Sequence, residues 1–174
     1  MFKLLILDVD GVLNDGKKYY DLNGNTFAKQ FSDKDFTAIK RFRASGIKVC
    51  FLSGDNKVNE NIAKNRNIDF YYSRGENALS KPDHIPMFEE KYNISSHEMA
   101  YVGDDFFDIE VMKCVKYKYC PIDSPKCVKD ICQVIPKIGG DNVICELYDI
   151  LISENLIKEC SSKDVYDLDK KENF

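Results

Sequence analysis

The chain has 174 residues, of which 44% are hydrophobic and 31% charged, so it is long enough to bury one sizeable core as a single globular domain. Its net charge of −4 provides no basic field for nucleic acid, and no apolar run approaches the roughly 18–20 residues that span a bilayer. We therefore expect neither a nucleic acid nor a membrane as a partner.

The N-terminal apolar run and the cysteines indicate a cytoplasmic protein. Asp8 interrupts the run, only Lys3 precedes it and no small-residue cleavage site follows, so a signal peptide is not expected. The seven cysteines form no Cys-x-x-Cys pair and are interpreted as reduced, often buried thiols. Neither they nor the two histidines have the spacing of a zinc site.

Strand patterns and helix patterns alternate along the sequence. In chain order, we predict a strand at 4–7, a β-hairpin at 17–31, a helix through Phe36, Ile39 and Phe42, a strand at 47–52, a helix at 57–66, a strand at 70–72, a helix at 83–92, a strand at 99–102, a helix at 108–114, a strand at 117–120, a helix at 125–131, a short strand at 134–135 and a helix at 143–152. Asn23-Gly24 predicts the hairpin turn, because both residues tolerate positive φ, and Gly46 ends the first helix. The polar, charged tail from Ser161 is typical of a segment that is disordered alone.

The alternation of strands and helices predicts an α/β fold, a Rossmann-like doubly wound parallel sheet with helices on both faces. We assign residues 1–160 to one domain and 161–174 to a polar C-terminal tail. Ligands of such sheets bind beyond the carboxyl ends of the strands. Asp8, Ser53 and Asp104 each fall just past a predicted strand, so the three are expected at one site.

Two aspartates one residue apart, Asp8 and Asp10, follow the first strand. Residues i and i+2 of an extended segment point the same way, so the two carboxylates can share a site. Crowded carboxylates repel each other unless a positive charge lies between them, and Mg²⁺, which prefers oxygen ligands, is the natural partner. A second acidic cluster, Gly103-Asp104-Asp105-Phe106-Phe107-Asp108, follows the strand at 99–102. The two clusters predict one metal site built by two strands.

Each motif also has a purely structural interpretation. Asp-x-Asp-Gly occurs in turns and in fragments of calcium loops, Ser53 could be the N-cap of the helix at 57–66, and a lone lysine such as Lys81 is usually a solvated surface residue. The second acidic cluster could cap the helix that starts near Asp108. Only the combination of the motifs favours catalysis.

The combination consists of four motifs, which occur in the order Asp8-x-Asp10-Gly11-Val12, Ser53-Gly54, Lys81-Pro82 and Gly103-Asp104-Asp105-x-x-Asp108. Over nearly the whole chain, this set resembles the haloacid dehalogenase-like phosphatase superfamily. The resemblance implies a phosphoric monoester hydrolase that works through an aspartyl-phosphate intermediate.

Displacement of a phosphate ester needs a nucleophile, neutralised phosphoryl oxygens and a proton for the leaving alkoxide. Asp8 is best placed to be the nucleophile, and Asp10 can donate the proton and later accept one from water. The Ser53 hydroxyl, the Gly54 amide and the Lys81 ammonium suit the phosphoryl oxygens.

The metal ligands are taken from the resemblance. It implies that Mg²⁺ is bound by Asp8, by Asp104 and by the main-chain carbonyl of Asp10. Asp105 and Asp108 are expected to act through water or from behind these ligands.

The gaps between the motifs leave no room for the cap domain that most members of the superfamily carry, so the chain resembles the capless branch. This branch contains 3-deoxy-D-manno-octulosonate 8-phosphate phosphatases and sialic-acid-type 9-phosphate phosphatases. The stretches that carry the closer resemblance are Asp8–Gly16, Lys29-Gln30-Phe31, Tyr101–Met112, Cys120-Pro121-Ile122-Asp123 and Gly139-Gly140. The resemblance implies a homotetramer in which the 17–31 hairpin packs against a neighbouring subunit and the 161–174 tail could reach an adjacent site.

The expected substrate is a small phosphorylated sugar acid of the 3-deoxy-D-manno-octulosonate 8-phosphate type, in lipopolysaccharide biosynthesis. Asp55 follows Ser53-Gly54 at a position where octulosonate-phosphate phosphatases usually have arginine and relatives acting on nine-carbon sugar acids often have an acidic residue. Asp55 is expected to face the substrate, where it would repel a carboxylate unless it contacts a hydroxyl or an amine. An N-acylneuraminate or nonulosonate 9-phosphate, in sialic acid biosynthesis, is therefore the alternative substrate. A broad-specificity phosphatase and a non-catalytic partner of a cytidylyltransferase remain as further alternatives.

Overall fold

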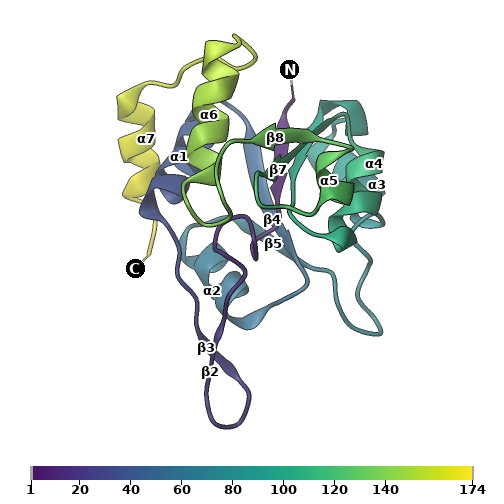
Figure 1. Cartoon of the computed structure of the whole chain (residues 1–174). Helices are drawn as coiled ribbons and strands as arrows, with labels where there is room; N and C mark the ends of the chain where they lie inside the picture. Colours follow the sequence, from purple (N-terminus) through teal and green to yellow (C-terminus); the bar gives the residue numbers. More distant parts are fainter. Residues whose placement is uncertain (1, 174) are drawn as a thin grey trace.

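The computed structural model describes residues 2–173 and is built around a six-stranded parallel sheet (Figure 1). Its strands are β1 (Leu4–Leu7), β4 (Lys48–Ser53), β5 (Asp69–Tyr72), β6 (Met99–Val102), β7 (Tyr117–Pro121) and β8 (Gln133–Ile135). They lie in the order β5-β4-β1-β6-β7-β8, and every neighbouring pair is parallel. The chain leaves β1 toward β4 on one side and later returns to β6 on the other. The doubly wound α/β fold predicted from the sequence is confirmed.

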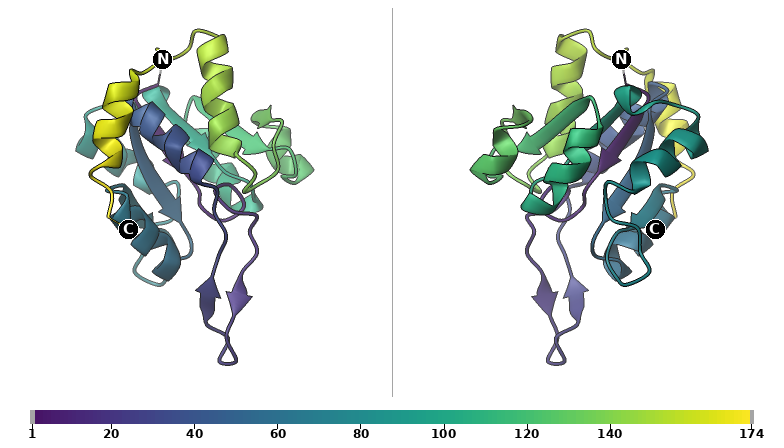
Figure 2. Two further views of the ribbon diagram at one scale, coloured as in Figure 1. Left: turned by 90° about the vertical axis from the view of Figure 1, so that its left-hand side faces the viewer. Right: turned by 90° about the vertical axis from the view of Figure 1, so that its right-hand side faces the viewer.

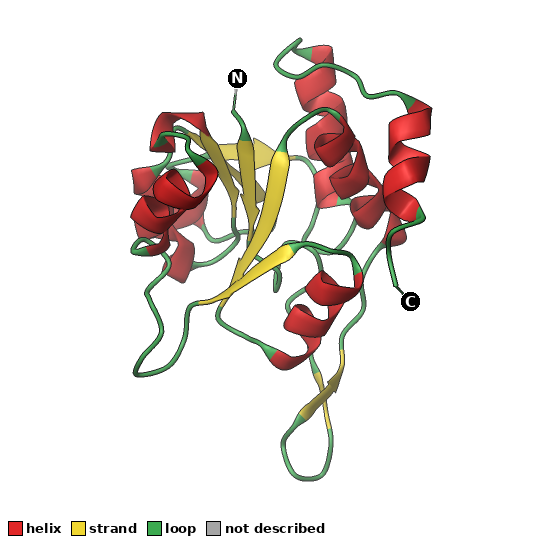
Figure 3. Ribbon diagram, turned by 180° about the vertical axis from the view of Figure 1, so that it is seen from behind, coloured by secondary structure: helices red, strands yellow, loops and turns green. Residues whose placement is uncertain are grey.

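Helices cover both faces of the sheet, as Figure 3 shows. One face carries α1 (Asp33–Ala44), α2 (Lys57–Asn65) and α6 (Val143–Ser153), and the other carries α3 (His84–Tyr92), α4 (Ile109–Cys114) and α5 (Lys126–Lys129). The alternation of side chains along β1 divides its leucine-rich run between two cores: Leu5 and Leu7 pack with the first set of helices, and Leu4 and Ile6 with the second. Two short 3₁₀ helices, η1 (Ser96–Glu98) and η2 (Phe106–Asp108), precede β6 and α4.

A β-hairpin between β1 and α1 projects from the body of the molecule in both side views (Figure 2). Its strands, β2 (Tyr19–Tyr20) and β3 (Thr26–Ala28), are antiparallel. The hairpin prediction for 17–31 is confirmed, but the turn differs from the expected one. Gly24 has a φ of +77° whereas Asn23 does not adopt positive φ, and the Asp21 carboxylate accepts hydrogen bonds from the amides of Asn23 and Asn25. The connection is therefore a five-residue loop built on an Asx turn.

The prediction of a disordered tail is wrong. Residues Ser162–Asp169 form a further helix, α7, which packs on α1. Lys40 of α1 has a nearly buried side chain, and its ammonium lies 2.5 Å from Asp169 and 3.2 Å from Glu172. The composition of the tail did not reveal these long-range ion pairs, which hold the helix in place. Whether 161–174 is separate from the domain 1–160 stays a prediction.

The connections on either side of β4 contain only small elements. The hairpin and α1 lie between β1 and β4, and α2, β5 and α3 lie between β4 and β6. In the part of the chain that the structure describes, neither connection contains a cap domain, as expected. Among these residues, no helix has the length and apolar character needed to cross a membrane.

Candidate active site

The predicted site residues meet at the carboxyl ends of three adjacent strands. Asp8 follows β1, Ser53 is the last residue of β4 rather than the first after it, and Asp104 lies two residues beyond β6. These positions surround a cavity of about 800 Å³. All seven residues predicted for catalysis, substrate or metal line it: Asp8, Asp10, Ser53, Gly54, Asp55, Lys81 and Asp104. Their roles in the reaction remain predictions, but their convergence agrees with the general rule for open parallel sheets.

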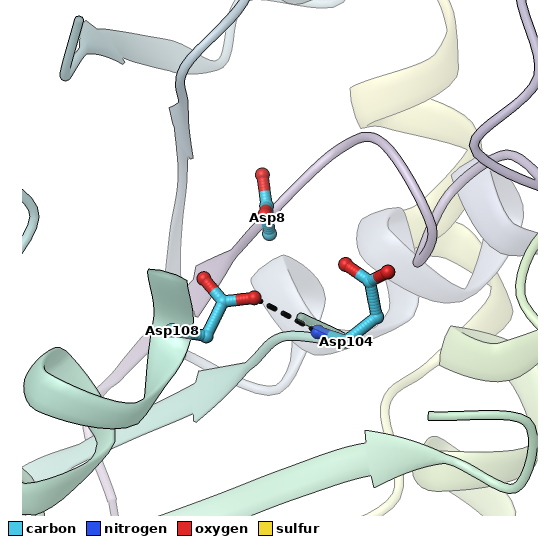
Figure 4. Close-up of side chains that lie close together, drawn as sticks. All are labelled: Asp8, Asp104 and Asp108. Atoms are coloured by element: carbon cyan, nitrogen blue, oxygen red, sulfur yellow. Dashed lines mark hydrogen bonds between the residues drawn. The ribbon is translucent and has the colours of Figure 1, made fainter. Parts of the chain in front are cut away.

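Three aspartates that line the cavity form a compact acidic cluster, and Figure 4 shows their side chains close together. Asp8, Asp104 and Asp108 each offer a carboxylate oxygen within 4.8 Å of the others. Burial raises the pKa of Asp8 to about 7, although Lys81 lowers it, and Asp108 adds to the rise. Burial, Asp8 and Asp108 raise the pKa of Asp104 to about 8. Three mutually repelling carboxylates at this spacing suit a hard divalent cation with oxygen ligands.

Lys81 provides positive charge within this cluster. Its Nζ atom lies 2.6 Å from Oδ2 of Asp8 and 2.6 Å from Oδ1 of Asp108. Burial opposes the charge of Lys81, but the two carboxylates outweigh it and raise its pKa. The alternative interpretation of Lys81 as a solvated surface lysine is therefore wrong. The amide of Val9 donates to the other oxygen of Asp8 at 2.7 Å, so both oxygens of this carboxylate are oriented.

Asp108 organises the acidic cluster from beneath. It is fully buried, and Oδ2 accepts hydrogen bonds from the amides of Asp104 and Asp105 at 2.9 and 3.0 Å. Oδ1 accepts from the hydroxyl of Tyr101 at 2.6 Å as well as from Lys81. Asp105 caps the 3₁₀ helix η2, since its carboxylate accepts from the Phe106 amide, whereas α4, the helix that starts after Asp108, has no side-chain cap. Asp108 thus fixes the backbone that presents Asp104.

Two glycines allow the loops to approach the acidic cluster. Gly11 has a φ of +83°, and a Cβ atom at this position would overlap the carboxylate of Asp104. Gly139 lies against Gly11 in turn, so that its own Cβ would overlap the Gly11 carbonyl. The amide of Gly140 donates to the Val12 carbonyl at 3.0 Å. The loop after β1 can therefore lie between Asp104 and the 139–140 segment only because Gly11 and Gly139 have no side chains.

A second polar network surrounds Asp10. Lys29, the residue that follows β3 of the hairpin, has a fully buried side chain. It donates to Asp10 at 2.7 Å, to Asp55 at 2.8 Å and to Asn59 at 2.9 Å. Asn59 also donates to Asp10 at 3.1 Å, and Asn14 does so at 2.9 Å. The carboxylate of Asp10 is thus directed toward these partners, while the compact acidic cluster consists of Asp8, Asp104 and Asp108.

Asp55 is neutralised by two lysines of the hairpin segment. Its Oδ2 lies 2.7 Å from Lys18 and 2.8 Å from Lys29. Burial opposes the charge, but these two lysines lower the pKa of Asp55 to about 2. Asp55 also donates its amide to the Ser53 hydroxyl at 3.2 Å, and the N-cap of α2 is Asn56. The interpretation of Ser53 as the N-cap of this helix is therefore wrong.

Four residues of this site were not predicted from the sequence: Lys18, Lys29, Asn59 and Arg74. Lys29 lies in one of the stretches on which the family resemblance rests, which is the only signal that could have identified it. The others belong to loops or to a helix whose local pattern is that of exposed polar surface.

The chain is similar in sequence and in structure to 3-deoxy-D-manno-octulosonate 8-phosphate phosphatases. No family model matches the chain. Over 152 residues, it is 32% identical to the 3-deoxy-D-manno-octulosonate 8-phosphate phosphatase of Escherichia coli strain K12, and the match covers 86% of this chain and 79% of that protein.

Two solved structures show the same fold. The cobalt-bound deoxy-D-mannose-octulosonate 8-phosphate phosphatase of Haemophilus influenzae matches with a TM-score of 0.80 at 28% identity, over 87% of this chain and 88% of the other. The 3-deoxy-D-manno-octulosonate 8-phosphate phosphatase of Yersinia pestis matches with a TM-score of 0.78 at 28% identity, over 88% and 83% of the two chains. The similarity covers most of each chain, as the four motifs in their order led us to expect.

Proposed function

Because the chain belongs to the 3-deoxy-D-manno-octulosonate 8-phosphate phosphatase family of haloacid dehalogenase-like phosphoric monoester hydrolases, we propose that it hydrolyses 3-deoxy-D-manno-octulosonate 8-phosphate or a closely related sugar acid phosphate. The observation that carries the proposal is the bridge from Lys81 to Asp8 and Asp108 beside Asp104, at 2.6 Å on each side. A buried carboxylate beside an ammonium and two further carboxylates has the charges that phosphoryl transfer requires.

Asp8 is the proposed nucleophile. One of its oxygens attacks phosphorus, the bond from phosphorus to the ester oxygen breaks, and an aspartyl-phosphate forms. The Val9 amide and Lys81 orient the carboxylate before the reaction. A divalent cation, proposed to be Mg²⁺ bound by Asp8, Asp104 and the main-chain carbonyl of Asp10, would offset the charge of the phosphoryl group. Ser53, the Gly54 amide and Lys81 are the proposed contacts of the phosphoryl oxygens.

Asp10 is the proposed acid and base. It donates a proton to the leaving alkoxide, and then accepts one from the water that attacks phosphorus and frees Asp8. Lys29, Asn14 and Asn59 hold its carboxylate at the cavity. Because Lys29 belongs to the hairpin segment, the position of the hairpin and the position of Asp10 are joined through one buried side chain.

The exposed apolar side chains of the hairpin support the proposal of a homotetramer. Tyr19, Tyr20, Leu22 and Phe27 of the hairpin are all exposed. Apolar side chains gathered on a projecting ribbon are more typical of a contact surface than of a solvated one. We propose that this surface packs against a neighbouring subunit of a cytoplasmic tetramer, and sedimentation at several protein concentrations tests it.

Phosphate release tests the activity. The enzyme, with Mg²⁺, is given octulosonate 8-phosphate, N-acylneuraminate 9-phosphate, glucose 6-phosphate and p-nitrophenyl phosphate. A strong preference for the octulosonate ester supports the proposal, whereas preference for the nine-carbon ester assigns the alternative substrate. Similar turnover of all four would indicate a broad-specificity phosphatase, and no release from any of them would contradict the proposed activity.

A further inference from the structure

The cavity is larger than a phosphoryl group requires. Its volume of about 800 Å³ lies within the range of sites that enclose a whole small molecule. Its floor is the acidic cluster with Lys81, and its rim includes Lys18, Phe107 and Arg74. The part of a substrate that is not phosphate must therefore be recognised by the rim.

The charge of this cavity opposes an anionic substrate. Among the described residues, seven acidic and three basic side chains line it. Two of the basic side chains are already paired, Lys81 with Asp8 and Asp108, and Lys18 with Asp55. No carboxylate within residues 2–173 lies within 4.0 Å of the guanidinium of the third, Arg74. Arg74 is thus the lining cation whose charge is available to a ligand.

Gly54 leaves room for this guanidinium, because it has no side chain. A Cβ atom added to Gly54 would be 3.2 Å from Nη2 and 3.3 Å from Nε of Arg74. The guanidinium therefore covers the backbone directly after Ser53, although Arg74 comes from the loop between β5 and α3. Both nitrogens belong to one edge of the planar group, and this fork geometry matches a carboxylate in a bidentate pair.

We propose that Arg74 determines specificity by binding the carboxylate of the substrate, an inference that rests on the proposed hydrolysis of a sugar acid phosphate. Such a substrate is anionic at both ends. Its phosphoryl group must reach Asp8, which is buried on the floor, so its carboxylate extends toward the rim, where Arg74 is exposed. Asp55 lies in the same rim, but Lys18 and Lys29 neutralise it, so it does not cancel the charge of Arg74.

Kinetics of Arg74→Gln and Arg74→Lys test this role, with Glu76→Gln as the matched control. Glu76 is exposed on the same loop and does not line the cavity. Arg74→Gln is expected to raise KM for octulosonate 8-phosphate by about 10- to 100-fold, the usual worth of a charge-assisted hydrogen bond. It should lower kcat/KM for glucose 6-phosphate much less than for octulosonate 8-phosphate, since glucose 6-phosphate has no carboxylate. Arg74→Lys should retain part of the affinity for octulosonate 8-phosphate. Glu76→Gln should leave kcat/KM unchanged for both substrates.

Two kinetic results would overturn the inference. Equal losses for both substrates would place Arg74 on the phosphoryl group, and unchanged KM for the acid would remove it from recognition. Calorimetric binding of free 3-deoxy-D-manno-octulosonate to the wild type and to Arg74→Gln separates this inference from the proposed activity. Weaker binding to the variant supports the role of Arg74 even if the wild type releases no phosphate, and equal binding contradicts it.

Discussion

The ammonium of Lys81 lies 2.6 Å from Oδ2 of Asp8, so the proposed nucleophile is paired with a cation before any substrate arrives. This contact explains how a carboxylate with little solvent access can lie beside two others. Because Lys81 also contacts Asp108, asparagine at position 8 can remove the nucleophilic carboxylate while it keeps the shape of the aspartate side chain.

Asp8→Asn is expected to reduce phosphate release by on the order of 10³-fold or more, because an amide cannot form the aspartyl-phosphate. The fold should be retained, since asparagine has the same shape and Lys81 keeps its contact with Asp108. Steady-state phosphate release and the melting temperature check both statements. Asp15→Asn, an exposed residue of the same loop that does not line the cavity, is the control. Near wild-type activity of Asp8→Asn would remove Asp8 from the nucleophile role.

Removal of divalent cations by EDTA is expected to reduce activity to background, and Mg²⁺ should restore it. The carboxylates of Asp8, Asp104 and Asp108 repel each other at their observed spacing, and a cation relieves this repulsion. Asp104→Asn should raise the Mg²⁺ concentration for half-maximal activity by about tenfold or more. Activity that survives dialysis against EDTA, with metal content checked by mass spectrometry, would contradict the proposed metal requirement.

Lys29→Met is expected to destabilise the protein by about 1–3 kcal/mol and to lower activity strongly. The buried ammonium of Lys29 compensates both Asp10 and Asp55, and removing it leaves two partly buried carboxylates close together. Urea unfolding measures the loss. Lys17→Met, at an exposed lysine of the same hairpin segment, should leave stability and activity unchanged.

A double variant sharpens this test. Adding Asp55→Asn to Lys29→Met removes one of the two uncompensated charges and should recover part of the lost stability. If the double variant is less stable than Lys29→Met alone, the lysine does not act mainly by neutralising these carboxylates.

The sequence predicted the elements of this site that depend on local pattern. Asp8, Ser53 and Asp104 follow apolar runs that become neighbouring parallel strands, so their convergence follows from the fold. The contacts of Lys29 and Arg74 were not predictable in this way. Lys29 meets Asp10 across 19 positions of the sequence, and Arg74 covers Gly54 from another loop. Both depend on how loops pack above the sheet, for which hydrophobic periodicity gives no signal.

Asp35 gives the stability of the fold a pH dependence. Its Oδ1 accepts hydrogen bonds from the amides of Ile144 and Cys145 at the start of α6, and its Oδ2 is buried without a partner. Burial raises the pKa of Asp35 to about 6, although these amides lower it. A carboxyl group whose pKa is higher in the folded state stabilises it below about pH 4, and this contribution is lost as the pH rises through about 6. The loss amounts to about 2 kcal/mol between pH 4 and 7.

Asp35→Asn should remove this pH dependence, because the amide oxygen can still accept from Ile144 and Cys145 and carries no charge. The variant is therefore expected to be more stable than the wild type at pH 7 and similar to it at pH 4. Urea unfolding at both pH values measures the difference, with the exposed Asp33→Asn of the same helix as the control. An equal pH slope in wild type and Asp35→Asn would show that Asp35 does not titrate in this range.

Glu172 distinguishes two roles of the C-terminal segment. Its side chain is 2% exposed, and Oε2 lies 3.2 Å from Lys40 and 3.0 Å from Arg66, so the segment is held on α1 and α2 of its own chain. Glu172→Ala leaves these two cations with less compensation and should cost about 1–3 kcal/mol of unfolding free energy while kcat/KM stays unchanged. Asp167→Ala, at a half-exposed position of α7, should change neither. If Glu172→Ala instead lowers kcat/KM without lowering stability, the segment acts at an active site, as the resemblance to tetrameric relatives implied, and its packing on α1 is not its main role.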